Sequence, residues 1–261
     1  MAARALRRRT VTLMTGTVLA AVASTAPLQA ASATPAGGTR PPPVDCRVTP
    51  CVALTFDDGP SDYTPAVLGA LERQHAVATF FLIGPHALRL RADVLREGRD
   101  GDAIGDHTVT HPHLTLVPPA RVRYELETAA RQIASVTGHR PTIFRPPFGA
   151  WNAKVRAAAA AAGLAVVTWN VDPRDWQHHD TRLIERSVLA RVRPGGIVVL
   201  HDRYATTPPA VPYLLRALTA RGYALVTVPQ LFATSGGMRP GVVYRHGPTP
   251  ENGRVEHGAV S

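Results

Sequence analysis

CVALTF, at residues 51–56, is the first of seven short runs of apolar and β-branched residues in the chain. The other six are AVATFFLI (76–83), DAIGDH (102–107), TIFR (142–145), LAVVTW (164–169), GIVVLH (196–201) and YALVTV (223–228). Most of these runs are apolar at consecutive positions, which is typical of strands that are buried on both faces. Helical stretches separate the runs, so the alternation predicts a parallel sheet covered by helices. Seven units favour a closed or nearly closed barrel over an open sheet.

Between the runs, apolar residues recur at the three-to-four spacing of amphipathic helices. Two such stripes are Val122, Leu126, Ala129, Ile133 and Val136, and Val211, Leu214, Leu215 and Leu218. The alanine-rich stretch 157–162 is a strong helix former, and Gly163 is placed to end that helix. We expect Thr181 to cap a further helix, which Pro194-Gly195-Gly196 stops.

The two ends of the chain differ in composition from its centre. Residues 1–33 have a basic start, a mostly apolar run and then small residues, which predicts a secretory signal peptide. The apolar run is too short to span a bilayer of about 30 Å as a helix, so we expect a secreted protein with no stable membrane anchor. Pro/Gly-rich residues 34–45 predict a flexible linker, residues 46–233 the folded domain, and residues 234–261 a flexible tail.

The net charge does not indicate a nucleic-acid partner. Lys+Arg 29 minus Asp+Glu 19 gives +10 over 261 residues. Four of the arginines fall within the first nine residues, however, and the others are scattered, whereas a phosphate-binding surface needs clustered positive charge. The hydrophobic content of 45% also excludes a wholly disordered chain.

The chain has two cysteines, Cys46 and Cys51. In an exported protein such a close pair predicts a small disulfide loop, although two free thiols are the alternative. Two cysteines alone do not make a structural zinc site, which needs four ligands.

Polar residues gather at the carboxyl ends of the predicted strands, and in parallel α/β barrels these ends share the face that carries the active site. They are Asp57-Asp58, His107, Arg145, the segment from Asp172 to Trp176, and His201-Asp202. His107 and His111 have His-x-x-x-His spacing, and Pro112 places them on a loop or one short turn. Two histidines and one carboxylate form the ligand set of a catalytic zinc ion. The alternatives are a structural histidine pair and a simple Asp-Asp-Gly-Pro turn.

Five segments in this order resemble the motifs of the NodB-homology polysaccharide deacetylases, carbohydrate esterase family 4. The segments are TFDDGP (55–60), HTVTH (107–111), FRPPFG (144–149), DPRDW (172–176) and VLHD (199–202), and the similarity covers about residues 51–230. The resemblance implies a distorted (β/α) barrel, one divalent metal ion and hydrolysis of acetyl groups from polysaccharides. Zn²⁺ is the expected ion, with Co²⁺ as the alternative.

The resemblance also implies a role for individual residues in each segment. Asp58, His107 and His111 match the metal ligands, and Asp57 matches the general base. Arg145 matches the residue that holds this base, and His201 matches the general acid, which Asp175 supports. Phe148 stands where the family usually has Tyr, and its N–H is expected to donate to the oxyanion. Pro147 is expected at the substrate, and Trp176 and Val199 match the wall around the acetyl methyl group.

The expected substrate is an N-acetylglucosamine polymer, either chitin-like or peptidoglycan-like, and a monomeric enzyme is expected. An acetyl xylan esterase, which removes O-acetyl groups, would use the same fold, metal and catalytic groups. A non-catalytic wall-binding barrel would lack at least one catalytic position, whereas all of them are present here.

Overall fold

The sheet of the computed structural model follows the pattern of apolar runs. The structure describes residues 44–250, so the predicted signal peptide and residues 34–43 of the linker lie outside the described residues. Each of the seven runs contains a strand, and an eighth strand follows them. The strands are β1 (Cys51–Gly59), β2 (Thr79–Leu82), β3 (Ala103–Asp106), β4 (Ile143–Phe144), β5 (Ala165–Val167), β6 (Gly196–His201), β7 (Ala224–Leu225) and β8 (Val243–Tyr244).

All strand pairs are parallel, and the sheet curls back on itself. The strand order is β6-β1-β2-β3-β4-β5-β8, with β7 paired to β1. After β5, Val171 forms one isolated parallel bridge with Val198 of β6. There the Val199 N–H donates to the Val171 carbonyl oxygen at 3.0 Å. This bridge joins the two sides of the curled sheet. β8 pairs with β5 at Val166 and Val167, which precede the bridge in the sequence. The fold is therefore the expected distorted parallel (β/α) barrel.

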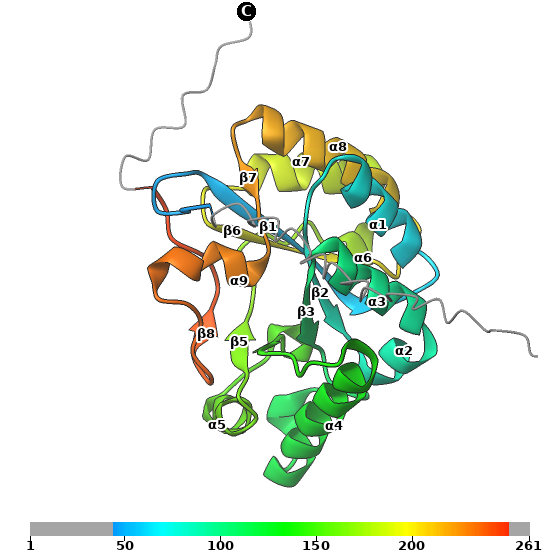
Figure 1. Ribbon diagram of the computed structural model, residues 1–261, viewed down its shortest axis with the longest axis vertical. Helices are drawn as coiled ribbons and strands as arrows, with labels where there is room; N and C mark the ends of the chain where they lie inside the picture. The colour runs from blue at the N-terminus through cyan, green and yellow to red at the C-terminus, as the bar shows by residue number, and fades with distance from the viewer. Residues whose placement is uncertain (1–43, 251–261) are drawn as a thin grey trace, which may run out of the picture. The chain divides into compact units, whose positions relative to one another are not determined.

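Helices occupy the connections between the strands. They are α1 (Thr64–Arg73), α2 (Gly84–Arg89), α3 (Arg91–Asp100), α4 (Pro119–Thr137), α5 (Ala153–Ala161), α6 (Asp175–His178), α7 (Thr181–Arg191), α8 (Thr207–Ala220) and α9 (Val228–Leu231). Figure 1 shows β1 beside β6, with α1, α7 and α8 packed near one another. Within residues 44–250, no helix has both the length and the apolar character that crossing a membrane requires.

Alternate residues of β1 face two different parts of the core. Val52, Leu54 and Phe56 belong to the apolar cluster that includes residues of α1 and α8. Ala53 belongs to a second apolar cluster, with Phe81 of β2 and side chains of β4 and β6. Side chains alternate in direction along a strand, so residues 55 and 57 share the face of Ala53. This register carries the first polar side chains of the site into the barrel interior.

The predicted helices are confirmed, with one correction at a cap. α4 and α8 bury the two predicted stripes, and Gly163, with φ 75°, follows the end of α5. Thr181 was expected to cap α7, but the cap is Asp180, whose Oδ1 accepts the Leu183 N–H at 3.0 Å. Thr181 instead donates its hydroxyl to the Thr206 carbonyl oxygen at 2.8 Å. A carboxylate accepts the free N–H groups of a first turn at least as well as a hydroxyl does.

The predicted flexible tail is wrong for residues 234–250. β8 pairs with β5, and the Gly247 N–H donates to the Gly195 carbonyl oxygen at 2.7 Å. The Gly241 N–H likewise donates to the Leu164 carbonyl oxygen at 2.8 Å. A two-residue strand has no apolar period of its own, because its stability comes from pairing with a distant segment. The folded domain thus extends beyond the predicted boundary at residue 233.

The predicted disulfide between Cys46 and Cys51 is confirmed, with 5.4 Å between their Cα atoms. Both cysteines are fully buried in the second apolar cluster. Asp45, the last residue of the predicted linker, accepts the Thr234 hydroxyl at 2.8 Å. The disulfide ties the start of β1 to the segment that precedes it. The hydrogen bond from Thr234 anchors Asp45, so this end of the predicted linker is fixed.

Candidate active site

A pocket of about 490 Å³ lies at the carboxyl ends of the strands. Its walls are the ends of β1 and β6 and the loops that follow β3, β4, β5 and β6. The lining residues are Asp57, Asp58, His107, His111, Phe148, Trp169, Asp172, Trp176, Val199, His201, Arg203 and Tyr204. Most of the polar residues that the sequence placed at the strand ends therefore line one pocket. Arg145 and Asp175 contact this lining through Asp57 and His201, whereas Asp202 is buried against Thr64 of α1.

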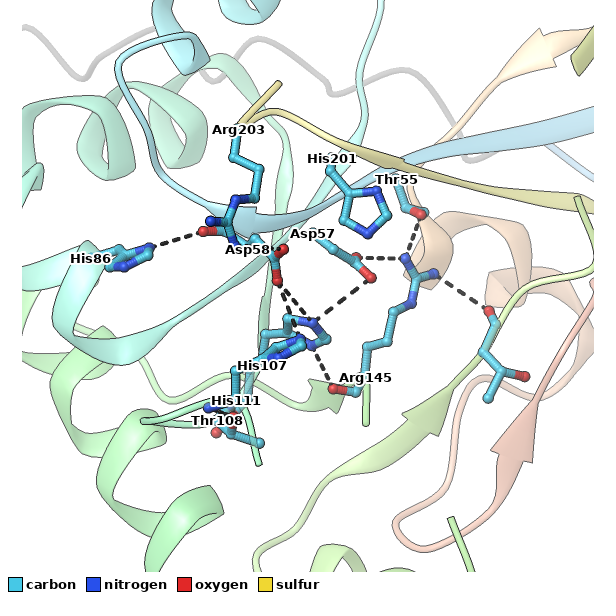
Figure 2. Close-up of polar contacts among 12 residues, drawn as sticks. Thr55, Asp57, Asp58, His86, His107, Thr108, His111, Arg145, His201 and Arg203 are labelled. Atoms are coloured by element: carbon cyan, nitrogen blue, oxygen red, sulfur yellow. Dashed lines mark hydrogen bonds and ion pairs between the residues drawn. The ribbon is translucent and has the colours of Figure 1, made fainter. Parts of the chain in front are cut away.

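An irregularity at the end of β1 separates the two adjacent carboxylates. The pairing of β1 with β2 shifts register between Asp57 and Gly59. Asp58 has φ 71°, in the left-handed region that residues other than glycine rarely adopt. Asp57 consequently reaches Arg145, whereas Asp58 reaches His107 and His111 (Figure 2). The two carboxylates therefore take different directions.

Asp58, His107 and His111 bring three metal-ligating atoms together. Asp58 Oδ1 lies 3.5 Å from His107 Nε2 and 3.4 Å from His111 Nε2. Within residues 44–250, no other group of three His, Cys, Asp or Glu side chains has ligating atoms that all lie within 4.8 Å of one another. Both histidines lie on the loop after β3, in agreement with the expectation from Pro112.

The state of these three side chains fits a divalent cation. Asp58 Oδ1 is buried and has no hydrogen-bond partner among the described residues, an arrangement that is costly unless a cation contacts the oxygen. Burial opposes the charge of Asp58, but the proximity and charge of His107 outweigh burial and lower the pKa of Asp58. His107 donates its Nδ1–H to the Arg145 carbonyl oxygen at 2.7 Å, so its Nε2 faces Asp58 and can bind a cation once Nε2 has lost its proton.

The loop that carries the two histidines is held by Glu125 of α4, which is fully buried. Glu125 Oε2 accepts the N–H groups of Val109 and Thr110 at 2.8 and 2.9 Å, and its Oε1 accepts the Thr110 hydroxyl at 2.7 Å. Burial opposes the charge of Glu125, but these hydrogen bonds outweigh it and lower its pKa. An ionised carboxylate inside α4 thus fixes the backbone between His107 and His111.

Replacing Glu125 with glutamine should loosen this loop. In either orientation the amide NH₂ would face N–H donors, those of Val109 and Thr110 or that of Arg121, whose Nε donates to Oε1 at 2.7 Å. We expect the free energy of unfolding to fall by about 1–3 kcal/mol. We also expect Zn²⁺ affinity to fall by about 10–100-fold, as for other groups that orient metal ligands. Glu127→Gln is the control, since Glu127 lies on the same helix but is exposed. Unchanged Zn²⁺ affinity in Glu125→Gln, measured by chelator competition, would refute the role of Glu125.

Arg145 lies inside the barrel, fully buried, and holds Asp57. Its Nη1 donates to Asp57 Oδ1 at 2.7 Å and to Thr55 Oγ1 at 2.6 Å. The guanidinium carbon lies 4.1 Å from the centre of the Phe81 ring, a favourable position for a cation. Asp57 Oδ2 is left 3.9 Å from His107 Nε2, at the pocket. The pair therefore presents one fixed carboxylate oxygen beside the three metal-ligating atoms.

His201 and Asp175 form a second pair on the other side of the pocket. His201 Nδ1 lies 2.8 Å from Asp175 Oδ1, and the His201 N–H donates to Asp175 Oδ2 at 2.7 Å. Asp175 is fully buried and also accepts the Thr207 hydroxyl at 2.8 Å. Burial alone would lower the pKa of His201, but the hydrogen bond and charge of Asp175 outweigh burial and raise it to about 9. His201 is therefore protonated at neutral pH, with its Nε2 side at the pocket.

Apolar side chains complete the pocket wall. Phe148 is 62% exposed and Trp176 is 47% exposed, whereas Val199 is buried. Phe148 has φ 62° and stacks on His113 with 5.1 Å between ring centres. The prediction that Pro147 contacts substrate finds no support in its position. Pro147 is buried and is absent from the lining, because it begins the short turn that presents Phe148.

Several residues of the site were missed from the sequence. Arg203 Nη1 lies 3.3 Å from Asp58 Oδ2, and Tyr204 and Trp169 line the pocket. Glu125 had a signal, since it is a charged residue three positions after Val122 on the buried stripe of α4. Arg203 had none, because the direction of the loop after β6 decides where its side chain lies.

The comparisons with known proteins agree with this geometry. Residues 45–167 match the family described as polysaccharide deacetylase. The chain is 42% identical over 203 residues to the chitooligosaccharide deacetylase of Bradyrhizobium sp. (strain ANU 289), a match that covers 72% of this chain and 93% of that protein. It is 37% identical over 182 residues to the peptidoglycan-N-acetylglucosamine deacetylase PgdA of Listeria monocytogenes serotype 1/2a, covering 69% of this chain and 38% of that protein.

A solved structure described as T48 deacetylase with substrate superimposes with a TM-score of 0.74 and 38% sequence identity. The superposition covers 77% of this chain and 99% of that one. The similarity to the Bradyrhizobium protein runs through almost its whole length, and the fold of the T48 deacetylase is shared as well. The chain belongs to the polysaccharide deacetylase (NodB-homology) family, carbohydrate esterase family 4.

Proposed function

We propose that this protein is a metal-dependent hydrolase that removes N-acetyl groups from N-acetylglucosamine polymers, either chitooligosaccharide or peptidoglycan. One observation carries the proposal. A single pocket holds a set of three metal-ligating side chains, a carboxylate fixed by a buried arginine, and a histidine paired with a buried carboxylate. These are the groups that hydrolysis of an unactivated amide needs.

Asp58, His107 and His111 would hold the ion, which we infer to be Zn²⁺, with Co²⁺ as the alternative. An ion bound there supplies a Lewis acid for the acetyl oxygen and lowers the pKa of a bound water toward about 7. Two neutral imidazoles and one carboxylate are a zinc-type donor set, whereas Mg²⁺ and Ca²⁺ prefer oxygen ligands alone.

Asp57 is the general base in this proposal. Its Oδ1 is engaged by Arg145, so its free Oδ2 is the oxygen at the pocket that accepts a proton from the attacking water. Arg145 keeps the carboxylate in one orientation, because the guanidinium is itself fixed by Thr55 and by the Phe81 ring. Proton transfer of this kind contributes about 10²–10⁴-fold in rate.

His201 is the general acid in this proposal. Water adds its oxygen to the acetyl carbon, the C–N bond breaks, and the departing nitrogen takes a proton from His201. An amine leaves poorly without that proton. Asp175 fixes the ring through Nδ1, so that Nε2 carries the transferable proton. The Phe148 N–H would stabilise the negative charge on the acetyl oxygen, while Trp176 and Val199 enclose the methyl group.

The Asp175–His201 pair predicts the alkaline limb of the pH profile. Activity should fall as pH rises through the pKa of His201, which Asp175 raises to about 9. Asp175→Asn removes the charge that raises this pKa and leaves the burial that lowers it. The limb should then move to lower pH, toward or below about 6.5. The measurement is kcat against pH on an N-acetylated chitooligosaccharide.

Asp172→Asn is the matched control, because Asp172 lines the same pocket but accepts the Arg174 N–H through its Oδ1. Its alkaline limb should stay where the wild-type limb lies. If the limb of Asp175→Asn also stays in place, another group controls it and His201 is not the acid.

We infer from the N-terminal sequence pattern that the protein is exported and acts on glycan outside the cell. We also propose that it acts as a monomer. Acetate release from chitooligosaccharide, peptidoglycan and acetylated xylan, measured side by side with one preparation of Zn²⁺-loaded enzyme, tests the proposed substrate class. We expect release from at least one of the N-acetylated polymers at a higher kcat/KM than from xylan. Release from acetylated xylan alone would identify an O-acetyl esterase instead.

A further inference from the structure

Arg203 contacts the proposed metal ligand Asp58 from the loop after β6. Its Nη1 lies 3.3 Å from Asp58 Oδ2, and half of its side chain is exposed to solvent (50%). Figure 2 shows Arg203 and the two histidines approaching the Asp58 carboxylate from different sides. Arg203 belongs to none of the motifs that match the family, and no role in the mechanism above uses it.

The two oxygens of Asp58 are therefore divided between two kinds of partner. Oδ1 faces His107 and His111 at 3.5 and 3.4 Å and lacks a hydrogen bond, whereas Oδ2 is paired with Arg203. A guanidinium on Oδ2 draws electron density away from the carboxylate and places a positive charge close to any cation on Oδ1. It also compensates the Asp58 charge when no ion is bound.

We propose that Arg203 is a positioning residue that weakens the hold of the site on its metal ion. It restricts Asp58 to ligation through Oδ1 and stabilises the metal-free protein by acting as a counter-ion. The inference rests on the proposed function, because it concerns the ion that Asp58, His107 and His111 would bind. A charge so close to the ligand also opposes the charge of the ion, so loss of Arg203 should tighten metal binding.

The proposal predicts a change in Zn²⁺ affinity opposite to the change expected if Arg203 only held Asp58 in place. A residue that only held Asp58 in place would lower Zn²⁺ affinity when removed, as orienting groups do. A competing counter-ion raises Zn²⁺ affinity when removed and destabilises the metal-free protein. Zn²⁺ affinity and the melting temperature of the two forms therefore separate the two roles without any activity assay.

The experiment compares the full-length wild-type protein with Arg203→Gln, Arg203→Lys and Arg131→Gln. Arg131 is the control, because it is an exposed arginine paired with a carboxylate on α4 and does not line the pocket. Zn²⁺ affinity is measured by competition with a chromogenic chelator at fixed pH and ionic strength. Melting temperatures are measured with and without Zn²⁺, since an ion that binds only the folded state raises the melting temperature.

For Arg203→Gln we expect Zn²⁺ to bind about tenfold more tightly, because the repulsion between the guanidinium and the ion is removed. Its metal-free form should melt at a lower temperature, and Zn²⁺ should raise that temperature by more than in wild type. Arg203→Lys keeps the charge and should resemble wild type, as should Arg131→Gln.

Unchanged or weaker Zn²⁺ binding in Arg203→Gln would overturn the proposal. Lysine behaving like glutamine would also overturn it, because the charge would then not be the cause. A wild-type protein that binds no divalent metal would overturn the proposed function, and this inference with it. The two failures are therefore distinguishable.

Discussion

Replacing His107 and His111 together with alanine is expected to abolish both metal binding and deacetylation. The two imidazoles supply two of the three ligating atoms that converge within 4.8 Å, and Asp58 alone cannot hold a zinc-type ion. Chelation of the wild-type protein should have the same effect, and added Zn²⁺ or Co²⁺ should restore activity. The measurements are bound metal per chain, by elemental analysis after dialysis, and acetate release from a chitooligosaccharide.

His113→Ala is the matched control for metal binding. His113 is the next imidazole along the same loop, but it stacks on Phe148 and its Nδ1 contacts the Thr115 hydroxyl at 3.1 Å. This variant should retain one ion per chain. Melting curves of all variants show whether the double variant is folded, since His107 also bonds to the Arg145 carbonyl oxygen. A folded double variant with full activity would exclude this group of residues as the metal site.

Asp57→Asn and His201→Ala should differ in their dependence on the leaving group. Asp57→Asn removes the acceptor of the water proton, so we expect a loss of about 10²–10⁴-fold on both an N-acetyl sugar and an aryl acetate. His201→Ala removes the donor to the leaving group. Its loss should be of similar size on the N-acetyl sugar but much smaller on the aryl acetate, because a phenolate departs without a proton.

The test is kcat/KM for each variant on both substrates, with the metal content of each preparation checked. The ratio of the two losses is the informative quantity, because it is insensitive to the active fraction of the enzyme. Equal losses for His201→Ala on both substrates would remove His201 from the role of general acid. A much larger loss for Asp57→Asn on the amide than on the ester would likewise exclude Asp57 as a base that acts on water alone.

The parallel sheet and its helices could be predicted because the central strands are apolar runs that must be buried on both faces. GIVVLH coincides with β6, whose six residues pair with β1 along its length. YALVTV contains only the two-residue strand β7, because β1 offers it pairing at Cys51 and Val52 alone. β8 could not be predicted, since its two residues become a strand only through contact with β5.

The position of the site could be predicted more fully than the contacts that hold its residues in place. The strand ends carried Asp57, Asp58, His107 and His201, and the parallel topology alone brings such ends to one face. The left-handed backbone of Asp58 and the burial of Pro147 depend on local turns that the residue types do not specify. The contacts of Glu125 and Arg203 join segments that are far apart in the sequence, so only the folded chain shows them.

The most direct measurement for the proposed activity is the yield of acetate and of free amine from an N-acetylglucosamine oligomer. It uses Zn²⁺-loaded wild-type protein, the same protein after chelation, and Asp58→Ala. Deacetylation in the pocket predicts equal amounts of acetate and free amine from the loaded enzyme and neither product from the other two. Release of acetate without free amine would contradict it. So would a yield from the chelated protein or from Asp58→Ala that equals the yield of the loaded enzyme.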